Sequence, residues 1–271
     1  MKPLVLALAG LMCSALAAFA GDESACSVAS ALVHADYPLP RVAQAIANKH
    51  LTILVVGSAS SSLPGLTGAK HAYPARLEAT LGKRLGGVEV RVVTSAQPRE
   101  TAAEMESNLE RLVETNKPAL VVWQAGTVDA MRGVDQDAFR ATLDDGIETI
   151  KDNDADVVLL NMQYSPRTES VISMGAYVDV MRFAALQHEI PLFDRLAIMK
   201  HWSELGTFDL YGTTRSTDTA ERVHDCIGRL LADLVMDGVK LVENDKASGL
   251  DGEMQKAKAL DKNEPRGTEG R

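Results

Sequence analysis

The fold follows from one stretch of the sequence, Ile53-Leu54-Val55-Val56-Gly57-Ser58-Ala59-Ser60-Ser61-Ser62. It begins with four consecutive aliphatic residues, three of them β-branched, which predict a short strand buried on both faces. The glycine and the small hydroxyl residues that follow allow the backbone to turn sharply and to point side chains at a ligand. Open α/β sheets place their binding sites at strand ends of this kind, so we expect the functional site here.

Strand-like and helix-like segments alternate on both sides of this stretch. Besides 51–56, strands are predicted at 88–93, 119–124, 157–162 and 190–193. Helices are predicted at 41–48, 73–85, 102–116, 139–153, 176–188, 196–205 and 218–236. This alternation is typical of βαβ units. The sequence therefore predicts an α/β protein, a three-layer α/β/α domain with a mainly parallel sheet covered on both faces.

The two ends of the chain are predicted to lie outside this domain. Residues 1–20 contain Lys2, an apolar run and Ala18-Phe19-Ala20, which is the pattern of a signal peptide cleaved after Ala20. The apolar run is too short for a transmembrane helix, so we expect an exported protein, periplasmic or secreted, with no transmembrane segment after cleavage. Residues 21–50 are then a lead-in segment and 51–236 the domain. Residues 237–271 are polar and predicted to be disordered.

Composition narrows the possible partners. The 271 residues carry a net charge of −9, which argues against a nucleic-acid partner. The sequence shows no His, Cys and Asp grouping with zinc-like spacing and no glycine-rich phosphate loop, so we expect neither a metal nor another cofactor. Cleavage would leave Cys26 and Cys226, which we predict to form a disulfide in an oxidising compartment; the alternative is two free thiols.

Six ordered segments together resemble one family. They are the serine-rich turn after the first strand, HAYPARLEATL at 71–81, PALVVWQAGTVDAMRGVD at 118–135, VVLLNMQYSPR at 157–167, IPLFDRLAIMKHW at 190–202 and a last helix preceded by Ser-x-Asp. Over about 38–235 the chain is similar to exported bacterial SGNH/GDSL hydrolases. The resemblance implies a flavodoxin-like hydrolase fold. It also implies a serine nucleophile, Gly and Asn donors to the oxyanion, and an Asp-x-x-His pair.

The first two blocks depart from this pattern. Counting from Gly57, the family's nucleophile position is occupied by Ala59, flanked by Ser58 and Ser60. After the second strand, where the family has its donor glycine, residues 94–99 contain no glycine. We therefore expect neither the nucleophile nor this oxyanion donor at its usual place.

The last two blocks depart as well. Gly126-Thr127-Val128-Asp129-Ala130 matches the family pattern except that Val128 replaces the asparagine and has no side-chain donor. Asp218 matches the aspartate of the last block, but the nearest imidazole is His224, six residues later rather than three. A helix places these two side chains on different faces.

Four independent departures favour a catalytically silent member of the family, which acts by binding. The ligand classes are an acylated saccharide, another cell-envelope component or a protein partner. Gln97, Arg99, Gly126 and Thr127 are the candidate ligand contacts; for Arg99 the alternative is an ion pair with Glu100 or Glu104. The competing hypothesis is an ester hydrolase, an esterase or carbohydrate deacetylase, with a rerouted nucleophile at Ser58 or Ser60 served by Asp218 and His224.

Overall fold

The computed structural model describes residues 25–211 and 217–262, and side chains as far as residue 248. The predicted signal peptide and the last residues of the predicted tail, 263–271, lie outside the described residues.

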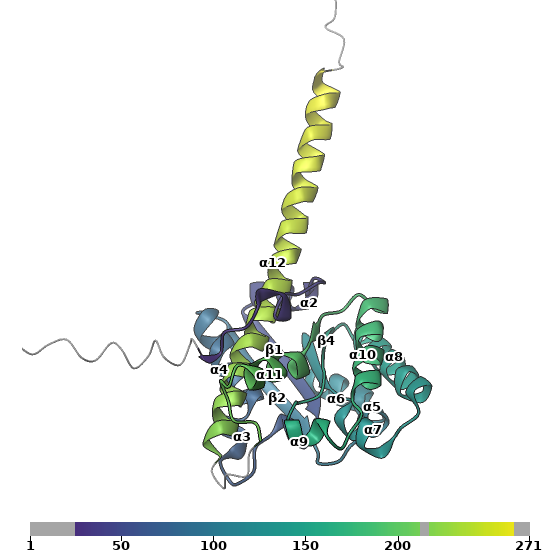
Figure 1. Cartoon of the computed structure of the whole chain (residues 1–271). Helices are drawn as coiled ribbons and strands as arrows, with labels where there is room; N and C mark the ends of the chain where they lie inside the picture. Colours follow the sequence, from purple (N-terminus) through teal and green to yellow (C-terminus); the bar gives the residue numbers. More distant parts are fainter. Residues whose placement is uncertain (1–24, 212–216, 263–271) are drawn as a thin grey trace, which may run out of the picture.

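A parallel sheet forms the middle of the domain. Within the described residues it has five strands in the order β2-β1-β3-β4-β5. The strands are β1 (His50–Gly57), β2 (Glu89–Ala96), β3 (Leu120–Gln124), β4 (Asp156–Leu160) and β5 (Leu192–Phe193). All neighbouring strands pair in parallel, so their carboxyl ends meet at one edge (Figure 1). The predicted sheet is confirmed.

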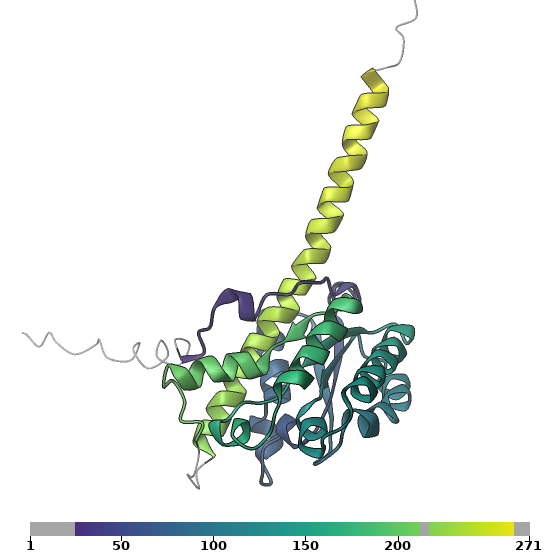
Figure 2. The ribbon, with the colours of Figure 1, turned by 45° about the vertical axis from the view of Figure 1, so that its right-hand side comes forward.

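Helices cover both faces of the sheet, as Figure 2 shows. One face carries α2 (Pro40–Ala47), α4 (Tyr73–Arg84), α11 (Arg195–Glu204) and α12 (Asp218–Lys262). The other carries α5 (Ala102–Glu106), α6 (Leu109–Asn116), α8 (Gln136–Asp152) and α10 (Gly175–Gln187). The short helices α3 (Gly68–His71), α7 (Thr127–Arg132) and α9 (Pro166–Glu169) lie in the connections that leave the carboxyl edge. The three-layer prediction is confirmed.

Strand β1 contributes side chains to the hydrophobic cores on both faces of the sheet. Ile53 and Val55 are buried on the α4 and α12 side, whereas Leu54 and Val56 are buried on the α8 side. Alternate side chains of a strand point to opposite faces, so a continuous aliphatic run is what a strand covered on both faces requires.

The predicted helix over 102–116 is in fact two helices. Ser107 Oγ and Asn108 Nδ2 both donate to the backbone oxygen of Glu104, at 2.9 and 3.3 Å. These side chains compete with the helical ladder at the junction between α5 and α6. The apolar spacing predicts the helical segments correctly, but it gives no signal of the break between α5 and α6.

The closing helix is longer than the sequence indicated. It continues through 236 to Lys262, so the predicted domain boundary and the predicted disorder of 237–262 are wrong. Two contacts explain the first extra turns: Leu39 N donates to Gly238 O at 3.1 Å, and Val239 and Val242 are buried. Beyond them the helix projects from the domain on the side away from α3 and α9 (Figure 1).

A disulfide between Cys26 and Cys226 ties the lead-in segment to α12, as predicted, with the two Cα atoms 5.0 Å apart. The two cysteines are 200 residues apart in the sequence. In the part of the chain that is described, no helix combines the length and apolar character needed to cross a membrane.

Candidate functional site

The candidate site lies where the strand order reverses. β1 is flanked by β2 on one side and β3 on the other, so the chain leaves these strands toward opposite faces. A crevice opens at such a switch point, outside the carboxyl ends of the strands. Here the serine-rich turn follows the carboxyl end of β1, and the Gly126 turn follows that of β3.

A buried glutamine side chain contacts the serine-rich turn. Gln124, the last residue of β3, is 1% exposed, and its Oε1 atom accepts hydrogen bonds from the turn after β1. The donors are Ser58 N at 3.0 Å, Ser60 Oγ at 3.0 Å, Ser61 Oγ at 3.2 Å and Ser58 Oγ at 3.3 Å. The Ser58 backbone donor fixes the orientation of the amide, because only the oxygen can accept. Gln124 thus fastens the turn to the neighbouring strand.

Gly57 makes this close approach possible. A Cβ atom at Gly57 would lie 2.3 Å from Ser61 Oγ and 3.0 Å from Gln124 Oε1, which no side chain tolerates without movement of the turn. The glycine at the end of β1 therefore serves the packing of the glutamine as well as the sharp turn.

The side chains of the turn differ in burial. Ala59, for which counting from Gly57 predicts the nucleophile position, is exposed and has no hydroxyl. Ser58 and Ser61 are buried, and Ser61 Oγ also lies 2.9 Å from Tyr73 Oη. The hydroxyls of Ser58, Ser60 and Ser61 thus contact Gln124 on the neighbouring strand.

Arg195 donates hydrogen bonds to the serine-rich turn. This first residue of α11 is 2% exposed, with Nη1 donating to Ser60 O and Nη2 to Ser60 Oγ, each at 3.1 Å. Burial lowers the pKa of Arg195 to about 10, so the guanidinium remains charged at neutral pH. Ser60 Oγ accepts a hydrogen bond from Arg195 and donates one to Gln124. The single proton of the Ser60 hydroxyl is therefore already used.

His224 is also committed to a backbone contact. Its Nδ1 atom accepts a hydrogen bond from Tyr73 N at 3.0 Å. The neutral ring therefore carries its proton on Nε2. Burial, together with the nearby Arg195 charge, lowers the pKa of His224 to about 4, so the ring is neutral at pH 7. A serine hydrolase requires the opposite tautomer, with Nε2 free to take the serine proton.

Asp218 and His224 stand at different places on α12. Asp218 is the exposed first residue of the helix, whereas His224 is buried against α4. The structure does not bring them together as an acid–base pair. This agrees with their six-residue spacing, which places two side chains on different faces of a helix. Among the described residues, no group of His, Cys, Asp and Glu is arranged to hold a metal ion.

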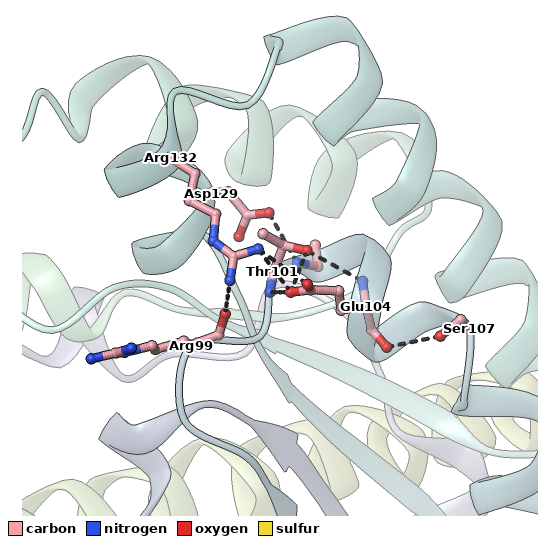
Figure 3. Close-up of polar contacts among 7 residues, drawn as sticks. Arg99, Thr101, Glu104, Ser107, Asp129 and Arg132 are labelled. Atoms are coloured by element: carbon pink, nitrogen blue, oxygen red, sulfur yellow. Dashed lines mark hydrogen bonds and ion pairs between the residues drawn. The ribbon is translucent and has the colours of Figure 1, made fainter.

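The loop after β2 contributes Gln97 and Arg99 to the rim. Both side chains are exposed. Arg99 has a left-handed backbone (φ 70°), and its carbonyl oxygen accepts from Arg132 Nη2 at 2.7 Å. Figure 3 shows its side chain pointing away from the cluster of Glu104 and Arg132. The ion pair of Glu104 is with Arg132 at 3.1 Å, not with Arg99.

The turn after β3 is held by a buried carboxylate. Asp129 accepts from Gly126 N at 3.1 Å and from Ala102 N at 2.9 Å, and burial raises its pKa. It therefore joins this turn to the start of α5, in a structural role. Thr127 and Val128 are half-buried at the start of α7, and Val128 has no side-chain donor.

A cavity adjoins this arrangement at the start of α12. Its volume is about 370 Å³, and it is lined by both apolar and polar side chains, among them Tyr164, Arg167, Met199, Tyr211 and His224. Concave sites with a few polar groups are where small molecules bind.

The sheet order, with its site at the carboxyl edge, defines the class: an SGNH/GDSL hydrolase fold. The model of the non-GDSL lipase-like family matches residues 25–241, and the chain belongs to that family. The resemblance seen in the sequence is thereby confirmed.

Two relatives illustrate the likeness. Esterase TesA of Pseudomonas aeruginosa is 31% identical over 115 residues, which are 42% of this chain and 56% of the esterase, so the match spans about half of that relative. A crystal structure of TesA superposes with a TM-score of 0.54 at 25% identity, covering 68% of this chain and 99% of that chain. An acetylxylan esterase from Geobacillus stearothermophilus gives 0.55 at 17% identity, over 68% and 94% of the two chains, which shows the fold alone.

Two residues of the site, Gln124 and Arg195, were not predicted from the sequence. Gln124 closes the apolar run Leu120–Gln124, and Arg195 interrupts another apolar segment, so both were visible as polar residues in buried surroundings. Buried Gln and Arg side chains are uncommon and need partners. Neither partner is close in sequence, because Gln124 contacts residues 63 to 66 positions away and Arg195 a residue 135 positions away.

Proposed function

We propose that this protein is a catalytically silent member of its family, exported to the cell envelope, where it acts by binding a ligand. The observation that carries the proposal is the contact of His224. Its Nδ1 atom accepts the Tyr73 N–H at 3.0 Å, which places the ring proton on Nε2 and leaves no free nitrogen to activate a serine.

The nucleophile position supports the same conclusion. Ala59 replaces the attacking serine, and the neighbouring hydroxyls are tied to Gln124. Moving attack to Ser58 or Ser60 would require breaking these contacts and finding another base, and the described residues offer none next to either hydroxyl.

Both expected oxyanion donors are replaced as well. The loop after β2 has Pro98, which lacks an N–H, in a segment without glycine, and Val128 lacks a side-chain donor. Loss of one such donor typically lowers the rate by about 10²–10³, so an enzyme without base and donors would retain little activity.

A former esterase cleft suits an acylated saccharide, another envelope component or a protein partner. The names of the relatives, an esterase and an acetylxylan esterase, favour the first of these classes. The disulfide between Cys26 and Cys226 supports export, since such bonds persist in oxidising compartments.

The competing function is an ester hydrolase with Ser60 as a rerouted nucleophile. One observation favours it: Arg195 Nη2 donates to Ser60 Oγ at 3.1 Å, and a cation stabilises an alkoxide. This contact uses only a lone pair of the hydroxyl, however. Without a base the proton stays on Ser60, which donates it in a hydrogen bond to Gln124 Oε1.

Labelling with a fluorophosphonate separates the two functions. The wild-type protein, with TesA as an active control, is incubated with the reagent, and the mass of the intact protein is measured. We expect complete labelling of TesA and none of this protein. Labelling that disappears in Ser60→Ala or Ser58→Ala would establish the rerouted enzyme and overturn our proposal.

A further inference from the structure

The imidazole of His224 offers a hydrogen-bond donor to the cavity at the start of α12. Its Nδ1 atom accepts from Tyr73 N, so the ring proton is on Nε2, and Nε2 makes no hydrogen bond within the described residues. His224 is 9% exposed and Nε2 is not fully enclosed, so this donor opens onto the cavity that His224 lines. A nearly buried donor of this kind favours a ligand that brings an acceptor.

Two buried apolar side chains, Met199 and Val223, line the same cavity as His224. A carbonyl group that carries a methyl group matches this combination, because its oxygen accepts from Nε2–H while its methyl group is removed from water. An amide carbonyl is a better acceptor than an ester carbonyl, since resonance with the nitrogen places more negative charge on the oxygen. The cavity therefore favours an acetamide over an acetate ester.

The charged residues of the cavity favour a neutral ligand. Arg167 and Asp209 both line it, both are exposed, and neither belongs to an ion pair in the described part of the chain. One cation and one anion give no net preference for a charged ligand, but they supply donors and acceptors for hydroxyl groups. Lys200 and Glu169, which lie beside Tyr164, pair with each other at 2.9 Å and add no net charge.

Tyr164 and Tyr211 add aromatic surface to the cavity. Tyr164 is buried and its Oη donates to Glu169 at 3.1 Å, whereas Tyr211 is 71% exposed. A pyranose presents C–H groups on its faces and hydroxyls around its edge, so it can pack on a tyrosine ring while its hydroxyls reach polar side chains. The volume of about 370 Å³ is at the lower end of the range for small-molecule sites and suits a mono- or disaccharide.

We propose that this cavity binds a neutral acetamido sugar, whose amide carbonyl accepts the hydrogen bond of His224 Nε2–H and whose methyl group packs on Met199 and Val223. The inference rests on the proposed function, because it gives a ligand to a protein that binds without catalysis and in which His224 is a donor rather than a base. It narrows the acylated saccharides to those that carry an N-acetyl group.

A matched pair of disaccharides tests the proposal. N,N′-diacetylchitobiose and cellobiose share their linkage and differ in having acetamido or hydroxyl groups. Each is titrated into the full-length protein by calorimetry. We expect saturable binding of diacetylchitobiose and binding about tenfold weaker for cellobiose, because one hydrogen bond and one buried methyl group are lost. No binding of diacetylchitobiose, or equal binding of the two sugars, would overturn the proposal. So would equal binding of N-acetylalanine amide, which has the acetamide but no sugar ring.

His224→Asn separates the donor from the structural contact. The asparagine oxygen can still accept from Tyr73 N, but no group remains at the position of Nε2. We expect diacetylchitobiose binding to fall about tenfold, to the level of cellobiose, while cellobiose binding is unchanged. His50→Asn is the control, since His50 is exposed at the start of β1, at the opposite edge of the sheet, and should bind both sugars as the wild type does. Unchanged diacetylchitobiose binding in His224→Asn would refute the role of this residue.

Tyr211→Ala locates the site even where His224→Asn does not fold. Tyr211 is exposed, so the fold should be retained, and both sugars should bind more weakly because both present pyranose faces. Wild-type binding of both sugars by Tyr211→Ala would place the sugar elsewhere and refute the proposal. Failure of the proposed function is seen separately, as fluorophosphonate labelling, which does not depend on sugar binding.

Discussion

Replacing Gln124 by leucine tests the contact on which the geometry of the site depends. Leucine has a similar volume but no acceptor, so the four donors that converge on Gln124 Oε1 lose their partner. Two of these donors have alternatives: Ser61 Oγ retains Tyr73 Oη, and the half-buried Ser60 hydroxyl, which still accepts from Arg195, can donate to water. The backbone N–H and the hydroxyl of Ser58 do not, and Ser58 is 4% exposed.

The magnitude follows from these two orphaned groups. A buried donor left without an acceptor costs about 1–3 kcal/mol. Two such groups, less the gain from burying a leucine, lower the free energy of unfolding by about 2–4 kcal/mol. For a domain of this size the melting temperature should fall by roughly 5–12 °C.

Urea denaturation measures the change in the free energy of unfolding. Gln124→Glu keeps an acceptor and should lose less stability than Gln124→Leu. Ser62→Ala is the matched control in the same turn, because the Ser62 hydroxyl makes only a local contact with Ala59 O at 3.3 Å. It should change stability by less than about 0.5 kcal/mol. A loss below about 1 kcal/mol in Gln124→Leu would refute the reasoning.

Three further predictions concern stability. Burial raises the pKa of Asp156 to about 6 from 3.8, so this carboxyl favours the folded state when protonated, and its contribution is lost as the pH rises from about 4 through 6. Asp156→Asn should therefore gain about 3 kcal/mol at pH 7 and nothing near pH 4 in urea titrations; equal effects at both values would contradict the assignment. Replacing Cys26 and Cys226 by serine should cost about 2–5 kcal/mol, and an unchanged melting temperature would show that the disulfide does not constrain the unfolded chain. Gly228→Ala should destabilise, since its Cβ would lie 2.5 Å from Arg76 Cβ, whereas Gly82→Ala meets no atom within 4 Å and should be neutral or stabilising by calorimetry.

The fold was predictable from the sequence because its signals are local. The aliphatic run of β1 is buried on both faces, and the turn glycine stands at the end of the strand as expected. Local patterns also explain the two errors in the helices. Apolar spacing does not detect the competing bonds of Ser107 and Asn108, and polar composition concealed the packing of Val239 beyond the predicted boundary.

For the site, the sequence predicts only which catalytic residues are absent. Counting positions points to Ala59 and Val128, because each is a change of residue type at a known place in the family pattern. The replacement chemistry was not predictable, since it depends on contacts between distant segments. Gln124 reaches across the sheet to the serine turn, and the tautomer of His224 is set by the backbone of Tyr73 in another helix.

Ester turnover tests the absence of catalysis most directly. Hydrolysis of p-nitrophenyl acetate is measured for the wild type and for Ala59→Ser, with TesA as the positive control. Our account predicts that neither form exceeds the background rate, because a restored hydroxyl still lacks a base and oxyanion donors. Turnover by the wild type, or by Ala59→Ser, above background would contradict it.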